Sequence, residues 1–199
     1  AQIANAGTYT VSLTNTTTGC ETVETTTVTV NPNPIISASN TGAYCEGETI
    51  TLNATGTGGD TFAWTGPNSF SSANEDPTIA NAQISNSGTY NVVLSNSTTG
   101  CVANASTIVA VNPNPMLSAG SNSPVCEGDE LQLSATGSNG NSYSWTGPNS
   151  FTSNDEDPVI ANSQTTNSGT YTVVLTNTST GCNTSASTSA VINPAPIVD

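Results

Sequence analysis

The chain has 199 residues and a formal net charge of -14, because it carries 14 acidic side chains and no lysine, arginine or histidine. Without cations it has nothing to neutralise phosphates, so we expect no nucleic-acid partner, and anionic membrane surfaces repel it. It also lacks the histidine base, the lysine nucleophile and the arginine clamp of most active sites, so we expect no enzyme. No stretch is long and apolar enough to predict membrane insertion.

The sequence repeats itself without a gap, at the fixed spacing that separates Cys20 from Cys101 and Cys101 from Cys182. Under this shift the three cysteines superimpose, and so do the two tryptophans, Trp64 and Trp145. A fixed period without insertions is typical of a tandem array. The predicted organisation is the C-terminal part of one repeat, two complete repeats and the start of another, at residues 1–31, 32–112, 113–193 and 194–199.

The first complete repeat begins with a stiff linker and a strand. The linker NPNP (31–34) has two prolines, which restrict their own backbone and that of the preceding residue. ITLNA (50–54) alternates apolar and polar residues, as a half-buried strand does. TGTGGD (55–60) and TGPNS (65–69) are rich in turn-forming residues and predict turns.

The second half of the repeat continues this pattern. YNVVL (90–94) and IVAV (108–111) predict further strands, and SNSTTG (95–100) predicts the turn between them. About seven short strands at this spacing indicate an all-β fold built from antiparallel β-sandwiches.

Both tryptophans lie in the same heptapeptide, WTGPNSF, at residues 64–70 and 145–151. The favoured interpretation is a core tryptophan on a strand, followed by a tight turn that needs glycine and proline. The alternative is an exposed GPNS loop that binds a ligand and gains avidity from being repeated.

Acidic residues gather in NEDP (74–77) and NDEDP (154–158). Oxygen-rich loops of this kind bind Ca²⁺, although no Asp-x-Asp-x-Asp-Gly loop occurs. The alternative is a solvated acidic edge that prevents strands of different molecules from pairing. We expect no other cofactor, and the candidate calcium ligands are Glu75, Asp76, Asp155, Glu156 and Asp157.

The stretch TIANAQISNSGTYNVVL (78–94) resembles the segment between strands E and F of immunoglobulin domains. This resemblance implies that Tyr90 and Tyr171 are tyrosine-corner residues, which pack in the core with Trp64 and Trp145. The two cysteines that many immunoglobulin domains bond across the core are replaced by apolar residues in both repeats, namely Ala54, Val92, Ala135 and Val173.

The whole chain is similar to the Ig-like repeats of very large secreted surface proteins of Bacteroidota, including gliding-motility adhesins. Those repeats have the pattern C-x-G … Y-x-W-x-G-P-x-x-F … S-G-T-Y-x-V … G-C. Here one repeat shows CEGETITL, FAWTGPNSF, NSGTYNVVL and TTGC, and the other shows CEGDELQL, YSWTGPNSF, NSGTYTVVL and STGC. The resemblance implies tandem immunoglobulin-like sandwiches arranged end to end.

The immunoglobulin strand order also bears on the disulfides expected in an exported chain. Cys45 precedes Ala54 on strand B by nine residues, whereas Cys101 follows strand F, so in that order they lie near opposite ends of one sandwich. A disulfide needs Cα atoms within about 7 Å. This favours Cys45–Cys182, across a joint between repeats, with Cys20, Cys101 and Cys126 pairing outside the sequence. A different strand order would give the alternative pairs within repeats, Cys45–Cys101 and Cys126–Cys182.

We therefore expect a structural or adhesive stalk, or an extracellular fibre, on a bacterial cell surface. Its partners would be neighbouring repeats of the same chain and, in a filament, other copies. The alternative is an array of ligand-binding modules for carbohydrate or protein.

Overall fold

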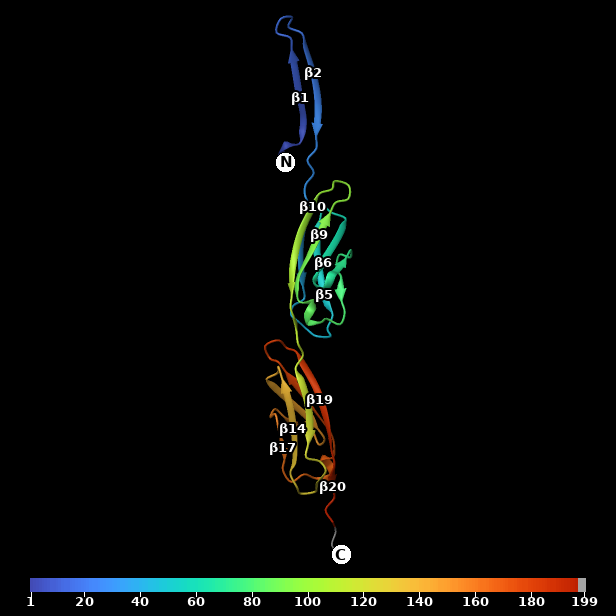
Figure 1. The fold of residues 1–199 in the computed structure, drawn as a ribbon, viewed down its shortest axis with the longest axis vertical. Coiled ribbons are helices and arrows are strands. Elements are labelled where there is room, and N and C mark those ends of the chain that lie inside the picture. Colours follow the sequence, from blue (N-terminus) through green and yellow to red (C-terminus); the bar gives the residue numbers. More distant parts are fainter. Residues whose placement is uncertain (197–199) are drawn as a thin grey trace. The chain divides into compact units, whose positions relative to one another are not determined.

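A computed structural model describes residues 1–196, which form β-strands joined by turns and by single-turn 3-10 helices (Figure 1). None of the helices in this part of the chain could cross a membrane. The short helices span Ile3–Asn5, Pro67–Ser69, Ile84–Asn86 and Thr165–Asn167.

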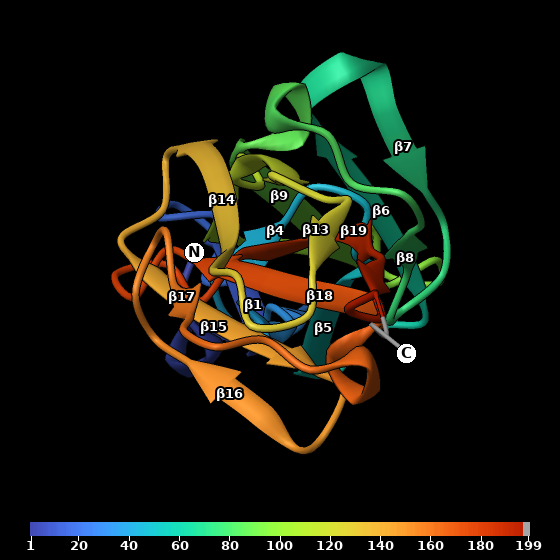
Figure 2. The same ribbon diagram turned by 90° about the horizontal axis from the view of Figure 1, so that it is seen from below.

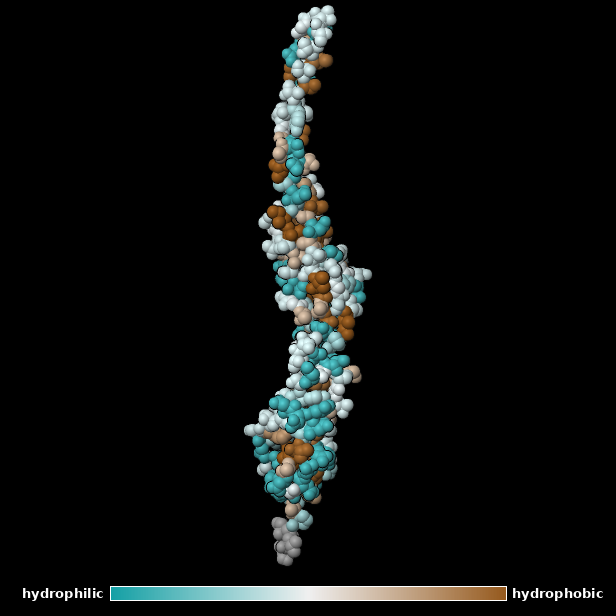
Figure 3. Space-filling model, turned by 90° about the vertical axis from the view of Figure 1, so that its left-hand side faces the viewer, coloured by the Kyte–Doolittle hydropathy of each residue, from teal (hydrophilic) through white to brown (hydrophobic). Residues whose placement is uncertain are grey.

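The N-terminal residues form a two-stranded hairpin. Its strands β1 (Gly7–Thr14) and β2 (Glu21–Val28) are antiparallel, and Tyr9 lies opposite Thr26. No other strand of the described chain pairs with them, and both strands are exposed over their whole length. Hydrophobic atoms therefore lie at the surface of this hairpin, at the top of Figure 3.

The first complete repeat contains two main sheets and one small parallel pair. One sheet has the order β3–β5–β8 and the other the order β10–β9–β6–β7. The parallel pair joins β4 (Tyr44–Cys45) to β11 (Val111–Asn112). The remaining strands are β3 (Ile35–Asn40), β5 (Ile50–Thr57), β8 (Thr78–Ile79), β6 (Thr61–Gly66), β7 (Phe70–Ser72), β9 (Gly88–Ser95) and β10 (Val102–Val109).

The second complete repeat has the same strand order. Its sheets are β12–β14–β17 and β16–β15–β18–β19, and β13 (Val125–Cys126) pairs in parallel with β20 (Ile192–Asn193). In Figure 2 strands β16, β15 and β18 follow one another as neighbours in one layer. The strands are β12 (Met116–Ser121), β14 (Leu131–Ser138), β17 (Val159–Ile160), β15 (Ser142–Gly147), β16 (Phe151–Ser153), β18 (Gly169–Thr176) and β19 (Asn183–Ala190).

Side chains that alternate along these strands make the core. In β14 every second residue from Leu131 to Ala135 is buried, because successive side chains of a strand point to opposite faces. These residues form one cluster with the inward side chains of the other sheet, so the two sheets pack as a sandwich. The cluster contains Leu131, Leu133, Ala135, Trp145, Tyr171, Val173, Ala190 and Ile192.

The chain packs as two compact units. The first comprises Ala1–Thr41, Thr51–Thr78 and Gly88–Ile108. The second comprises Gly42–Ile50, Ile79–Ser87 and the chain from Val109 onward. Within the second unit backbone hydrogen bonds tie the first two segments together: Gly47 N–H donates to Ala82 O at 2.8 Å, and Ala82 N–H donates to Glu48 O at 2.8 Å.

Two predicted boundaries were wrong. The glycine-rich stretch 55–60 was expected to be a turn, but β5 continues through it to Thr57, which pairs with Ile35. A Cβ atom on Gly56 would lie 2.5 Å from Leu94 Cδ2, so this glycine makes room for a core leucine rather than for a turn. The strand predicted from 108 begins earlier, because β10 already starts at Val102.

Candidate functional site

The tryptophan of each heptapeptide lies in the core. Trp64 and Trp145 are 1% and 0% exposed. Each indole Nε1–H donates to a backbone carbonyl of the acidic loop in its own repeat, residues 74–77 or 154–158. Trp64 donates to Glu75 O at 2.9 Å, and Trp145 donates to Glu156 O at 3.2 Å. Since a buried indole N–H needs an acceptor, these bonds let the ring stay inside the sandwich and fix the loop beside it.

The rest of the heptapeptide packs around the buried tyrosine. A Cβ atom on Gly66 would lie 2.4 Å from Tyr90 Cδ1, so only glycine allows this close approach. The Phe70 ring meets the Tyr90 ring edge to face, with centroids 5.4 Å apart. Pro67 lies over Gly88, the first residue of β9. Most of WTGPNSF is therefore scaffold, and its Thr, Asn and Ser are the residues that stay exposed.

The tyrosine corner is present in both complete repeats as a buried ring. Tyr90 and Tyr171 are fully buried, and burial raises the pKa of both phenols. The Tyr171 hydroxyl donates to Asn167 O at 2.8 Å. The positions of the missing core cysteines are filled by packing: Val173 is fully buried and Ala135 is 5% exposed.

The aspartates among the calcium candidates make hydrogen bonds within the fold. Asp76 Oδ1 accepts from Ala54 N–H at 2.9 Å, and Asp157 Oδ1 accepts from Ala135 N–H at 3.0 Å. Each bond ties the acidic loop to the neighbouring strand β5 or β14. Asp155 interacts locally, because its Oδ2 accepts from the Ser153 hydroxyl at 3.3 Å.

Glu156 also has a local partner. Its Oε1 accepts from the Tyr143 hydroxyl at 2.8 Å, and this bond raises the pKa of that phenol. Glu75 uses its backbone carbonyl, which accepts from Trp64. Across residues 1–196, no three acidic or cysteine side chains gather as metal ligands would. Calcium binding by these loops stays a prediction.

The structure joins Cys45 to Cys182 by a disulfide within the second compact unit, with Cα atoms 5.6 Å apart and 137 positions apart in the sequence. Cys101 and Cys126 keep free thiols, so neither alternative pair is bonded. Cys20 is also a free thiol and is exposed.

A rigid backbone frame holds Cys45. The parallel pair β4–β11 places Cys45 opposite Asn112, and Glu46 N–H donates to Asn112 O at 3.0 Å. A turn follows, in which Glu48 N–H donates to Cys45 O at 3.1 Å. This frame leaves little sign in the sequence, because a strand of two residues has no alternation to detect.

The free thiol of Cys126 lies in the same kind of frame. It sits opposite Asn193 in the parallel pair β13–β20, and Glu127 N–H donates to Asn193 O at 2.8 Å. Asp129 N–H donates to Cys126 O at 3.0 Å. Cys126 therefore repeats the local geometry of Cys45 and is exposed.

The other bonded cysteine ends a tight loop that occurs three times. Asn177 N–H donates to Cys182 O at 2.8 Å, and Gly181 has φ = 80°, which favours glycine. Around Cys101 and Cys20 the corresponding bonds are 2.9 Å from Asn96 and 2.8 Å from Asn15. All three cysteines are thus presented by the same loop, and of the three Cys182 is the bonded one.

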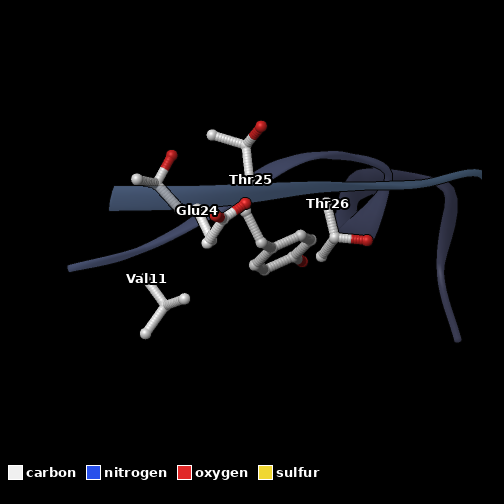
Figure 4. Close-up of a pocket in the computed structure, with 6 residues that line it drawn as sticks. Val11, Glu24, Thr25 and Thr26 are labelled. Atoms are coloured by element: carbon white, nitrogen blue, oxygen red, sulfur yellow. The ribbon is translucent and has the colours of Figure 1, made fainter. Parts of the chain in front are cut away.

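An open hollow of about 200 Å³ lies on the N-terminal hairpin (Figure 4). Tyr9, Val11 and Glu24 line it together with three threonines. In Figure 4 the side chains of Val11 and Thr25 lie on opposite sides of the hairpin ribbon. The hollow brings together no charged pair and no candidate catalytic group, so we assign it no chemistry.

Comparison with known proteins identifies the fold. No protein-family model matches the chain, and no curated protein matches its sequence. Among solved structures, the titin I-band fragment I67-I69 superposes with a TM-score of 0.54 at 15% identity, covering 98% of this chain and 77% of that one. Extracellular domains 3-5 of Drosophila OTK superpose with a TM-score of 0.50 at 13% identity, covering 96% and 72%.

These similarities show that the chain has the fold of tandem Ig-like domains. At 13% and 15% identity they concern the fold alone. The two strand orders and the buried Trp–Tyr pair agree with that fold.

Proposed function

We propose that the chain is a segment of a structural or adhesive stalk, or of an extracellular fibre, on a bacterial cell surface. The observation that carries this proposal is the Cys45–Cys182 bond, because it connects one sequence repeat covalently to the next. Repeats that work independently gain nothing from such a bond, whereas repeats that transmit force gain a joint that cannot open. Disulfides of this kind persist in oxidising surroundings, which supports a place outside the cytosol.

The same joint would recur along a longer array. Cys126 has the frame of Cys45, and Cys101 has the loop of Cys182. In the proposal, Cys126 and Cys101 each form a disulfide with a cysteine of another repeat. The two thiols are oxidised by exchange with a small-molecule disulfide, which takes up two electrons and two protons and becomes two thiols. Neighbouring repeats are thus the main partners, and lateral contacts with other copies would build a fibre.

Immunogold labelling of intact cells of the source organism with antibodies against the chain tests the location. The expected result is labelled threads or stalks outside the cell envelope. Label that appears only after lysis would contradict a surface stalk. Deletion of the gene gives the functional control, since the threads should disappear with the label.

An array of ligand-binding modules is the second candidate, and the repeated Asn-Ser tip supports it. Asn68 and Asn149 are exposed and adopt positive φ angles of 53° and 56°. A glycan array probed with the intact chain tests this candidate. Saturable binding that is lost when both asparagines are changed to glycine would support it, because glycine keeps this backbone conformation and removes the side chain.

A further inference from the structure

The single disulfide changes the covalent path along which the chain carries tension. Without it, tension that enters at Pro32 passes through every residue before it leaves at Asn193. With it, tension runs to Cys45, crosses to Cys182 and continues to Asn193. The residues between the two cysteines then form a closed loop that carries no tension.

The closed loop contains most of the buried core. Both tryptophans and both core tyrosines lie between Cys45 and Cys182. The loaded segments are β3 and β4 on one side and β19 and β20 on the other. Unfolding of the enclosed residues can therefore add no length between the ends of the pair of repeats, and of the second core cluster only Ala190 and Ile192 lie on the loaded side.

The spacing of the remaining cysteines extends this scheme. Cys20 precedes Cys45 by the same number of positions as Cys101 precedes Cys126. Suppose that Cys126 is bonded as Cys45 is, and that Cys20 and Cys101 are bonded as Cys182 is. Tension then enters each of the segments 20–45 and 101–126 at one cysteine and leaves it at the other. Each of these short segments then crosses one linker, and the bond at each of its ends leads to a neighbouring repeat.

We propose that the joint disulfides form a covalent tension-bearing path that bypasses most of each sandwich core and limits how far the chain can extend. The sandwiches space and protect this path, and the bonds carry the load. This inference adds a mechanism to the proposed stalk, because a stalk held this way cannot lengthen by domain unfolding. It rests on the proposed function only in assuming that the chain is under tension.

Single-molecule stretching of the complete chain, held by tags at its two termini, tests the path directly. The oxidised chain should reach full extension after only about 220 Å, because only residues 1–45 and 182–199, 63 of the 199, remain on the path, at ~3.5 Å per residue. A dithiol reductant reduces the Cys45–Cys182 bond to two thiols and is itself oxidised to a disulfide. Reduction should release about 480 Å more chain length, corresponding to the separation of 137 positions.

The released length also distinguishes the possible pairings. A Cys45–Cys101 bond would hide a much shorter loop, and reduction would then release only about 200 Å. The Cys45→Ser variant should extend fully without reductant, and Cys126→Ser should behave as the unchanged chain does. The shorter release, or full extension of the oxidised chain, would overturn the bypass.

The two proposals can fail separately. If the longer release is seen but antibodies label no surface structure, the path exists in a chain that is not a stalk. If surface threads are found but the oxidised chain extends fully, the stalk bears load through its folded domains instead.

Discussion

The hairpin β1–β2 and the hairpin β18–β19 have the same length and register but opposite surroundings. Gly7 pairs with Val28 at one end of the first, and Gly169 pairs with Ala190 at the same end of the second. Tyr9 is 50% exposed, whereas its equivalent Tyr171 is fully buried.

The comparison separates local from tertiary contributions. The Tyr9 hydroxyl donates to Asn5 O at 2.9 Å, just as Tyr171 donates to Asn167 O at 2.8 Å. Strand pairing and the corner hydrogen bond are therefore local properties of the sequence. Burial comes from the opposite sheet and from Trp145, which pairs with Val173. Since an isolated two-stranded hairpin is only marginally stable in water, we expect the second hairpin to owe its stability to that cover.

Removing the tryptophan side chain that packs with the buried hairpin should have the largest effect on stability. Trp145→Ala should destabilise its repeat by about 3–5 kcal/mol, because truncating a buried tryptophan leaves a cavity. That is comparable to the whole stability of a small domain. Urea unfolding, with hydrogen exchange of the β18–β19 amides, measures it. Tyr9→Ala in the exposed hairpin is the control and should change stability by less than about 0.5 kcal/mol. Equal unfolding midpoints for Trp145→Ala and the unchanged chain would show that the tryptophan is not the cover.

The acidic loop should have the second-largest effect. Asp157→Ala leaves the Ala135 N–H without its acceptor, which should destabilise the repeat by about 1–3 kcal/mol. Asp157→Asn keeps an oxygen at that position and should be milder. Thermal unfolding of both variants checks this difference. If Asn proves as damaging as Ala, the charge rather than the hydrogen bond matters.

Ca²⁺ added to the unchanged chain then tests the calcium prediction, with Asp157→Asn as its control.

The corner hydroxyl should matter less, and should matter only in the buried hairpin. Tyr171→Phe removes the bond to Asn167 and should destabilise the repeat by about 1 kcal/mol. Tyr9→Phe removes the same bond where water can replace it, so we expect a change near zero. Equal effects in the two hairpins would mean that burial does not strengthen this bond. Paired denaturation curves of the single variants give the comparison.

The smallest effect concerns alkaline pH. Burial raises the pKa of Tyr171 above the ordinary value of about 10, so the folded state keeps a proton that the unfolded state loses. This pKa difference contributes to the free energy of unfolding. The contribution is fully present below about pH 10 and is lost as pH rises through the raised pKa of the folded state. Tyr90 and Tyr143 also have raised pKa values, so tyrosinate absorbance should show several late-titrating phenols, and Tyr171→Phe should lower their total amplitude by one tyrosine. An unchanged titration curve in that variant would contradict the assignment.

The sequence predicted much of the fold because its signals come from packing that recurs. The fixed period aligns two buried tryptophans and two buried tyrosines, and alternation in ITLNA marks a half-buried strand. The glycines of TGTGGD misled the turn prediction, because Gly56 and Gly59 leave room for Leu94 from a strand far along the chain. Such a contact cannot be read from neighbouring residues.

The candidate site was only partly predictable for similar reasons. The immunoglobulin strand order implied which ends of the sandwich the cysteines occupy. The parallel pairs β4–β11 and β13–β20, which orient Cys45 and Cys126, have only two residues per strand and leave no periodic signal. The acceptor role of Asp157, which lies in a loop, depends on a bond from Ala135 on strand β14, 22 positions earlier in the sequence. Composition indicates that the loop is acidic, but it does not indicate which backbone N–H the carboxylate of Asp157 accepts from.

Pairing between neighbours also affects how such a chain changes in evolution. Any window that is one repeat long contains one cysteine of the Cys45 kind and one of the Cys182 kind, wherever the window starts. A gene that gains or loses a whole repeat by recombination therefore keeps the two kinds in equal number. The length of the array can change freely, and the joints that remain keep the same chemistry.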